Sequence, residues 1–228
     1  MFKTYSMYIM FSIGTVFMGV LIMLRKKKYH LKAWQAVLFT LALAAVGLAG
    51  VRLLAILEQF KALIQGDIAG GMSFYGCVFL IPILMPLFGK LFKLSPAETL
   101  DLCAPCVLAM LACMRINCYV SGCCGGIVIY LPGKELYPHP QLIECAADLL
   151  IMTVLLVKEK KDKKPGAGYP RMLIYYGILR FFLEFIRETP KDIWFMSRGQ
   201  IYSLIGITVG LLFLIYLAQK KRNGGKTK

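Results

Sequence analysis

Acidic residues are scarce in this sequence. Of its 228 residues, 12 are Asp or Glu and 27 are Lys or Arg, so the formal net charge is +15. A basic balance of this size can indicate a nucleic-acid partner. The chain has no DNA-binding or RNA-binding motif, however, and its basic residues gather in short segments between apolar runs. That distribution is typical of a protein oriented in a membrane with anionic headgroups, so no nucleic acid is expected as a partner.

Internal repeats and signs of a second domain are also lacking. Long apolar runs instead recur along the whole chain, with 58% hydrophobic residues and a mean hydropathy of +0.66. A soluble domain of this size needs far less apolar sequence. We therefore predict an all-α membrane protein in which residues 1–228 form a single polytopic membrane domain.

Seven apolar runs are long enough to be drawn as transmembrane helices. They cover residues 5–24, 34–57, 72–92, 96–118, 140–157, 170–187 and 199–218. Ser95, Pro96 and Glu98 form a helix-start pattern, with a serine cap, a proline at the first position and a glutamate three residues after the cap. Between the fourth and fifth helices, Pro132-Gly133 predicts a small hairpin that pairs residues 127–131 with residues 135–137.

The distribution of Lys and Arg predicts how these helices are oriented. Of the 27 basic residues, 18 fall in the 25–32 and 158–171 loops, the 90–93 corner and the tail from residue 220. Cytoplasmic segments carry the excess of Lys and Arg. We therefore expect the N-terminus outside and the C-terminus in the cytoplasm, which places the hairpin on the extracytoplasmic side.

Three arginines lie within the predicted helices, near their outer ends. Arg52, Arg115 and Arg180 fall roughly 6–11 Å below the outer surface at about 1.5 Å of rise per residue. An arginine in the hydrocarbon region costs about 3 kcal/mol on insertion scales, so each one is a functional-site hypothesis. Tyr5 and the 70–75 segment enter the membrane at the same level, so these groups are expected to meet in the outer leaflet.

Glu184 favours a site over a set of unrelated anchors. It follows Arg180 by four residues, so the two side chains are expected to form an ion pair one helical turn apart. Guanidinium groups match phosphate oxygens and keep their charge when desolvated. Two or three of them in the outer leaflet predict an anionic phospholipid headgroup as the ligand. Arg187 suits the alternative, an interfacial anchor whose side chain reaches the membrane surface.

Short motifs in a fixed order carry a resemblance to a known family. They are Gly50-Val51-Arg52, Gly70-Gly71-Met72-Ser73-Phe74-Tyr75-Gly76, Arg115 followed by Gly122 and Gly126, Pro140-Gln141-Leu142-Ile143-Glu144, Tyr176-Gly177 followed by Arg180, Glu184 and Arg187, and Gly199-Gln200. With these residues the chain resembles the bacterial prolipoprotein diacylglyceryl transferases over nearly its whole length. That family transfers the diacylglyceryl unit of phosphatidylglycerol to a lipobox cysteine, which forms a thioether and releases glycerol phosphate.

The resemblance implies a transferase that crosses the bacterial cytoplasmic (plasma) membrane several times and uses no cofactor. Its partners would be phosphatidylglycerol and a lipobox-type signal peptide or another thiol acceptor. The residues expected to act in catalysis are Arg115, Arg180, Tyr75 and Cys123. Those expected to bind substrate are Tyr5, Arg52, Gly70, Gly71, Ser73, Cys118, Gly122, Gly126, Gln141, Glu144, Tyr176, Glu184 and Arg187. No metal ligands are assigned.

Three of these positions differ from the residues that are usual in the family. Tyr75 stands in place of a histidine, Cys118 in place of an asparagine and Cys123 in place of a glutamate. A Cys123 thiol would act as base or nucleophile only if its pKa falls, which a nearby Arg115 would favour. Two alternatives therefore stay open: a phospholipid-binding or transport protein without chemistry, and a membrane thiol–disulfide oxidoreductase.

The cysteines divide into two groups. Five are expected to pack between helices, namely Cys77, Cys103, Cys106, Cys113 and Cys145, although Cys103 and Cys106 form the CxxC pair that suggests the oxidoreductase. Cys118, Cys123 and Cys124 lie together at the outer face beside glycine, where a disulfide, a reactive thiol and a metal site all remain open. His139 is a candidate fourth ligand, but its proline neighbours favour a role at a helix start.

Overall fold

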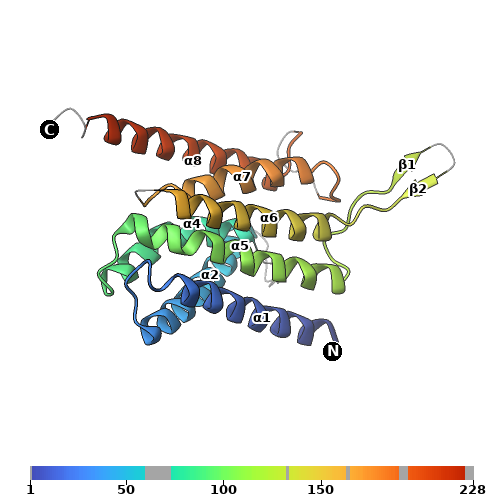
Figure 1. The fold of residues 1–228 in the computed structure, drawn as a ribbon. Coiled ribbons are helices and arrows are strands. Elements are labelled where there is room, and N and C mark those ends of the chain that lie inside the picture. The colour runs from blue at the N-terminus through green and yellow to red at the C-terminus, as the bar shows by residue number, and fades with distance from the viewer. Residues whose placement is uncertain (1, 60–72, 132–133, 163–164, 190–194, 224–228) are drawn as a thin grey trace. The chain divides into compact units, whose positions relative to one another are not determined.

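The computed structural model describes residues 2–59, 73–131, 134–162, 165–189 and 195–223. These residues form seven α-helices and one short hairpin (Figure 1). The helices are α1 (Phe2–Arg25), α2 (Ala33–Glu58), α4 (Phe74–Lys90), α5 (Pro96–Val120), α6 (Pro140–Lys161), α7 (Gly168–Leu183) and α8 (Arg198–Asn223). The chain divides into two compact units: a first unit of Met1–Met18 with Ala104–Lys228, and a second unit of Gly19–Cys103.

Five of the described helices are long and apolar enough to cross a membrane, namely α1, α2, α5, α6 and α8. The helices α4 and α7 are shorter, with 17 and 16 residues. Each of these seven helices overlaps one of the seven predicted spans. The α-helical class is therefore confirmed and the protein is a multi-pass membrane protein, whereas a count of seven crossings stays a prediction.

Two helices begin with a reciprocal capping box. At the start of α5, the Ser95 hydroxyl accepts the Glu98 N–H and the Glu98 carboxylate accepts the Ser95 N–H. This confirms the predicted helix start. At the start of α8, Ser197 and Gln200 exchange the same two hydrogen bonds. Each box satisfies two N–H donors that a helix leaves without an internal partner.

In the second unit, α2 packs along α4 through two glycines. A Cβ atom added to Gly50 would lie 2.5 Å from the Gly76 carbonyl oxygen, so the two backbones touch where neither residue has a side chain. Small residues at such crossings allow membrane helices to pack closely. In the same unit, Arg25 donates hydrogen bonds to the carbonyl oxygens of Asp101 and Leu102, at 2.7 and 2.9 Å.

In the first unit, α7 lies along α8 and α6 packs beside α7 (Figure 1). The crossing of α7 with α8 again uses glycine: a Cβ atom on Gly177 would lie 3.0 Å from the Ser203 carbonyl oxygen. Because α6 packs against α7, polar residues of these two helices contact each other in this unit. That packing positions the site described below.

The end of α7 differs from the prediction. The predicted span ran to residue 187, but α7 ends at Leu183, and Arg187 forms an antiparallel bridge with Gly126. Ile127 donates its N–H to the Ile186 carbonyl oxygen at 3.0 Å. This close approach favours glycine, since a Cβ atom on Gly126 would lie 3.0 Å from the Ile186 carbonyl oxygen and 2.7 Å from the Pro138 carbonyl oxygen. The prediction that Arg187 continues the helix was wrong because backbone pairing with the loop after α5 replaces the last helical turn.

The loop between α5 and α6 contains the hairpin. Strand β1 (Ile129–Leu131) pairs antiparallel with β2 (Lys134–Leu136), with Ile129 opposite Leu136 and Leu131 opposite Lys134. The predicted hairpin is confirmed, with strand ends shifted by one or two residues. In Figure 1 it extends beyond the ends of α5 and α6.

Candidate active site

Glu144 on α6 is the centre of a buried polar network in the first unit. Arg115 on α5 forms an ion pair with it, at 2.9 Å between Nη2 and Oε1. Tyr176 on α7 donates its hydroxyl hydrogen to the same oxygen at 3.1 Å. Arg180, one turn further along α7, places its Nε 3.9 Å from that oxygen. One carboxylate oxygen therefore joins side chains from three helices, and Glu144 keeps only 2% of its surface exposed.

A second carboxylate holds Arg180 from the other side. Glu184 lies 2.8 Å from Nη1 of Arg180, and both residues are buried. This confirms the predicted ion pair between residues four apart. Gly199, at the start of α8, makes room for it, because a Cβ atom there would lie 2.9 Å from the Glu184 carboxylate. The guanidinium of Arg180 is thereby fixed between two carboxylates.

The arginines of this network keep hydrogen-bonding capacity for a ligand. The Nε donors of Arg115 and Arg187 are buried and have no hydrogen-bond partner among the described residues. The charge of Arg187 also acts on Glu144. Arg115 and Arg180 pair with Glu144 and Glu184, and Arg187 adds a third guanidinium group. A positively charged group of forked donors of this kind suits phosphate oxygens.

One member of the network, Asp148, is not among the site residues predicted from the sequence. It follows Glu144 by one turn of α6, is 0% exposed, and neither of its carboxylate oxygens has a hydrogen-bond partner among the described residues. An ionisable side chain within an apolar run is a signal that was available from the sequence. It was overlooked because its neighbours carry no recognisable motif.

The loop that follows α5 begins with a Schellman motif. Gly122 has a φ of +68° and donates its N–H to the Tyr119 carbonyl oxygen, and Cys123 donates its N–H to the Cys118 carbonyl oxygen, both at 3.1 Å. In this motif the residue after the left-handed glycine contacts the residue five positions earlier. The motif therefore brings Cys123 against Cys118. Gln141 of α6 fixes the loop by donating from Nε2 to the Cys123 carbonyl oxygen at 2.7 Å.

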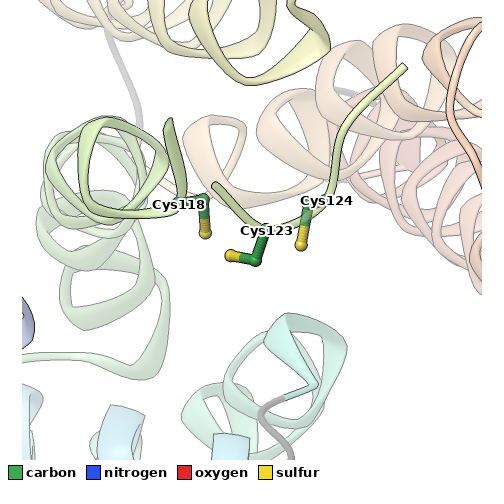
Figure 2. Close-up of side chains that lie close together, drawn as sticks. All are labelled: Cys118, Cys123 and Cys124. Carbon is green, nitrogen blue, oxygen red and sulfur yellow. The ribbon is translucent and has the colours of Figure 1, made fainter. Parts of the chain in front are cut away.

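Cys118, Cys123 and Cys124 form a compact cluster of thiols, called here the thiol triad. Their three Sγ atoms all lie within 4.8 Å of one another. Figure 2 shows the three side chains on the same side of the loop. All three are free thiols, and Cys123 is exposed. The predicted proximity of these cysteines is confirmed.

Cys123 was expected to act as a base or nucleophile only if the pKa of its thiol is lowered, and the structure gives the opposite direction. Burial raises the pKa of the Cys123 thiol above its usual range. A hydrogen bond from Cys118, together with the charges of Arg187 and Arg115, lowers the pKa of Cys124 to about 5. Cys124, which is not among the site residues predicted from the sequence, is thus the thiol of the triad whose pKa is lowered. A role for Cys123 in the chemistry stays a prediction.

Several predicted site residues lie outside this network. Tyr5 is on α1 of the first unit and is 60% exposed. The others belong to the second unit: Arg52 is exposed on α2, Ser73 donates to Glu58 at 3.0 Å, and Tyr75 is buried with its ring stacked on Phe79. Gly70 and Gly71 fall outside the described residues. A role for these six residues in one site with the arginines stays a prediction.

The buried cysteines outside the triad and His139 behave as packing residues. Cys103 and Cys106 are each 0% exposed, and Cys77 and Cys113 are also buried. Disulfide exchange needs a sulfur that a partner thiol can reach, so the CxxC pair does not support an oxidoreductase. The His139 ring packs edge-on against Tyr119, with 5.3 Å between ring centroids, and it directly precedes α6. Its predicted helix-start position is confirmed.

The fold and the site together define a class of protein. It is a multi-pass membrane protein that buries a network of arginines and glutamates between helices α5, α6 and α7. A family model for prolipoprotein diacylglyceryl transferase matches residues 1–216, and the chain belongs to this family of transferases.

Individual relatives match over most of the chain. A phosphatidylglycerol–prolipoprotein diacylglyceryl transferase of Clostridium tetani is 27% identical over 92% of this chain and 91% of the relative. A protein named phosphatidylglycerol–prolipoprotein diacylglyceryl transferase 2, from Clostridium perfringens, is 26% identical over 98% of this chain and 96% of the relative. A phosphatidylglycerol–prolipoprotein diacylglyceryl transferase of Cupriavidus necator is 30% identical over 70% of this chain and 64% of the relative. The similarity therefore extends over the whole fold.

Proposed function

We propose that this protein transfers the diacylglyceryl group of phosphatidylglycerol to the cysteine thiol of a lipoprotein precursor. The observation that carries the proposal is the pair of buried arginines, Arg115 and Arg180, held by the shared carboxylate of Glu144. Buried arginines in a membrane protein are expensive unless they serve a ligand or a pathway. The names of the relatives supply the two substrates.

The network assigns a role to each of its residues. Arg115 and Arg180 bind the phosphate of the lipid, and Arg187 adds positive charge beside them. Glu144, Glu184 and Tyr176 are positioning residues, because their oxygens contact the guanidinium groups or one another rather than open space. Gln141, Gly122 and Gly126 shape the loop. Tyr5, Arg52, Ser73 and Tyr75 are kept as candidates for the lipid and peptide contacts.

The reaction balances as a displacement at carbon. The acceptor sulfur loses its proton and uses an electron pair to form a bond to the glyceryl carbon. The bond between that carbon and its phosphate oxygen breaks, and glycerol phosphate leaves with the electrons. Negative charge develops on the leaving phosphate, where two forked guanidinium groups stabilise it. This arrangement needs the arginines to be fixed before substrate binds, which the two carboxylates achieve.

We propose that the chain resides in a bacterial plasma membrane and crosses it seven times, with the N-terminus outside. The excess of Lys and Arg in the 25–32 and 158–171 loops supports this orientation. Reporter fusions should place both loops and the C-terminus in the cytoplasm and the hairpin β1–β2 outside. A cytoplasmic signal from a fusion in the hairpin would contradict both the orientation and an outward-facing site.

The direct test of the activity is product formation. Purified protein is incubated with labelled phosphatidylglycerol and a peptide that carries a lipobox cysteine. We expect a thioether-linked diacylglyceryl peptide and one equivalent of glycerol phosphate, and no product from the same peptide with serine in place of cysteine. Saturable lipid binding without any thioether would instead identify a non-catalytic phospholipid-binding protein.

Glu184 offers a test of the positioning role. Its carboxylate lies 2.8 Å from Nη1 of Arg180, a contact that orients the guanidinium. Glu184→Gln keeps the shape and a hydrogen-bond acceptor, so it should lower turnover less than Glu184→Ala. The comparison is made from initial rates at several lipid concentrations. If both variants lose all turnover while remaining folded, Glu184 transfers a proton and the positioning role is wrong.

A further inference from the structure

We propose that the thiol triad of Cys118, Cys123 and Cys124 binds a Zn²⁺ ion, and that this ion takes the acceptor thiol as its fourth ligand. The first part stands on the geometry of the loop. The second part rests on the transferase function proposed above. Nothing in the arginine–glutamate network requires an ion, so the triad is a separate site.

The positions of the sulfur atoms suit one small ion. All three Sγ atoms lie within 4.8 Å of one another. A tetrahedral Zn²⁺ holds each thiolate sulfur at about 2.3 Å, which sets neighbouring sulfurs about 3.8 Å apart. The sulfur atoms therefore need to approach one another by about 1 Å at most to reach this spacing. A disulfide would use two of the sulfurs and leave the third without a role.

The backbone is built to present these thiols together. The Schellman motif sets Cys123 against Cys118, and Gln141 fixes the Cys123 carbonyl. Cys124 has a φ of +61°, in the left-handed region that residues with a side chain rarely adopt. Such a conformation is strained, and strained residues are concentrated at functional sites. The strain places the third sulfur on the same side of the loop as the other two (Figure 2).

The triad lies one helical turn from the arginine network. Cys118 follows Arg115 by three residues on α5, and Gln141 precedes Glu144 by three residues on α6. Three residues of helix correspond to about 4.5 Å along the axis. The ion pair of Arg115 with Glu144 and the contact of Gln141 with the loop therefore lie about one helical turn apart along α5 and α6. An ion in the triad lies beside the place where the lipid phosphate binds.

Coordination by three protein sulfurs leaves a fourth position for the acceptor. A site with three protein ligands and one open position is the arrangement of catalytic zinc, and a thiol that coordinates zinc loses its proton. The acceptor sulfur would give its proton to water on binding and attack the glyceryl carbon as a metal-bound thiolate. The exposed edge of the triad at Cys123 gives a peptide access to this position. The site thus supplies the deprotonated nucleophile that the arginine network lacks.

Ion binding is tested on the whole purified protein, reduced and freed of metal. Titration with Cd²⁺ should give one ion per chain with the absorption of thiolate-to-metal charge transfer, and Zn²⁺ should displace it. Cys124→Ser should weaken binding on the order of a hundredfold, because one of three ligands is lost. Cys145→Ser is the matched control, a partly exposed cysteine on α6 outside the triad, and should change nothing. Equal binding in the two variants, or none in the unmodified chain, overturns the site.

A second measurement needs no substitution. Zn²⁺ should slow alkylation of Cys118, Cys123 and Cys124 in the unmodified protein and leave alkylation of Cys145 at the same rate, as read by peptide mass spectrometry. Alkylation rates of the triad that do not respond to Zn²⁺ overturn the site even if the serine variant fails to fold. A disulfide within the triad that persists in reductant does the same.

The fourth position is tested with Co²⁺ in the site. A lipobox peptide with cysteine should shift the Co²⁺ absorption bands, and the serine peptide should not. Chelation should abolish thioether formation and added Zn²⁺ should restore it. Metal binding without the peptide shift, and with transfer unaffected by chelation, overturns the role of the ion in transfer. If no transfer occurs in any metal state, the proposed function fails, whereas the ion site still stands or falls by its binding measurements.

Discussion

Arg115→Ala should lower kcat/KM for phosphatidylglycerol by about tenfold to hundredfold, the equivalent of roughly 1.5–3 kcal/mol of charge-assisted hydrogen bonding to phosphate. Arg115 is 8% exposed and keeps its buried Nε donor for a ligand. Arg115→Lys should recover part of the stability and little of the activity, because a point charge lacks the planar fork. The measurement is the rate of thioether formation with varied lipid concentration.

Arg171→Ala is the matched control for this prediction. Arg171 is also an arginine paired with a carboxylate, Asp162, but its side chain is 23% exposed and it lies about 13 Å from Arg180 along α7. It should keep the turnover of the unmodified protein. A similar loss in Arg171→Ala and Arg115→Ala would mean that lipid is attracted by overall basic charge rather than by the buried network.

Glu144→Met should destabilise the fold more than any other change to the network, by about 3–5 kcal/mol. The carboxylate serves Arg115, Tyr176 and Arg180, so its loss leaves a buried guanidinium without its nearest counter-charge. Arg115→Met should also be costly, because Glu144 then keeps only the weaker contact with Arg180. The double variant should lose much less than the sum of the two, since it removes both charges together.

Reversible unfolding in mixed detergent micelles measures this cycle. The comparison pair is Arg171→Met and Asp162→Met, whose partly exposed ion pair should show coupling of about 1 kcal/mol or less. Additive losses for Arg115 and Glu144 would show that the two residues do not stabilise each other. In that case the view of Glu144 as the centre of the network is wrong.

The helices and some of their ends were predictable because the apolar runs and capping residues that define them are close together in the sequence. Apolar runs set the position of every described helix, and the serine–glutamate box set the start of α5. The equivalent box at Ser197 and Gln200 has the same local signature and was open to the same reasoning. The end of α7 was not predictable, since it depends on a loop that lies 60 residues away in the sequence and pairs Gly126 with Arg187.

For the site, the sequence alone determined which charges are unusual and how those on one helix pair. An arginine in an apolar run is costly wherever it lies, and a glutamate four residues away is its neighbour by helix geometry, so Arg115, Arg180 and Glu184 stood out without a fold. Tertiary structure decided the rest. Only the packing of α6 beside α7 makes Glu144 a shared carboxylate and buries Asp148 with no hydrogen-bond partner among the described residues. Only the turn at the end of α5 gathers three sulfurs in one place and sets the burial and the neighbouring charges that shift the pKa of each thiol, because these depend on distances between residues that the linear order does not relate.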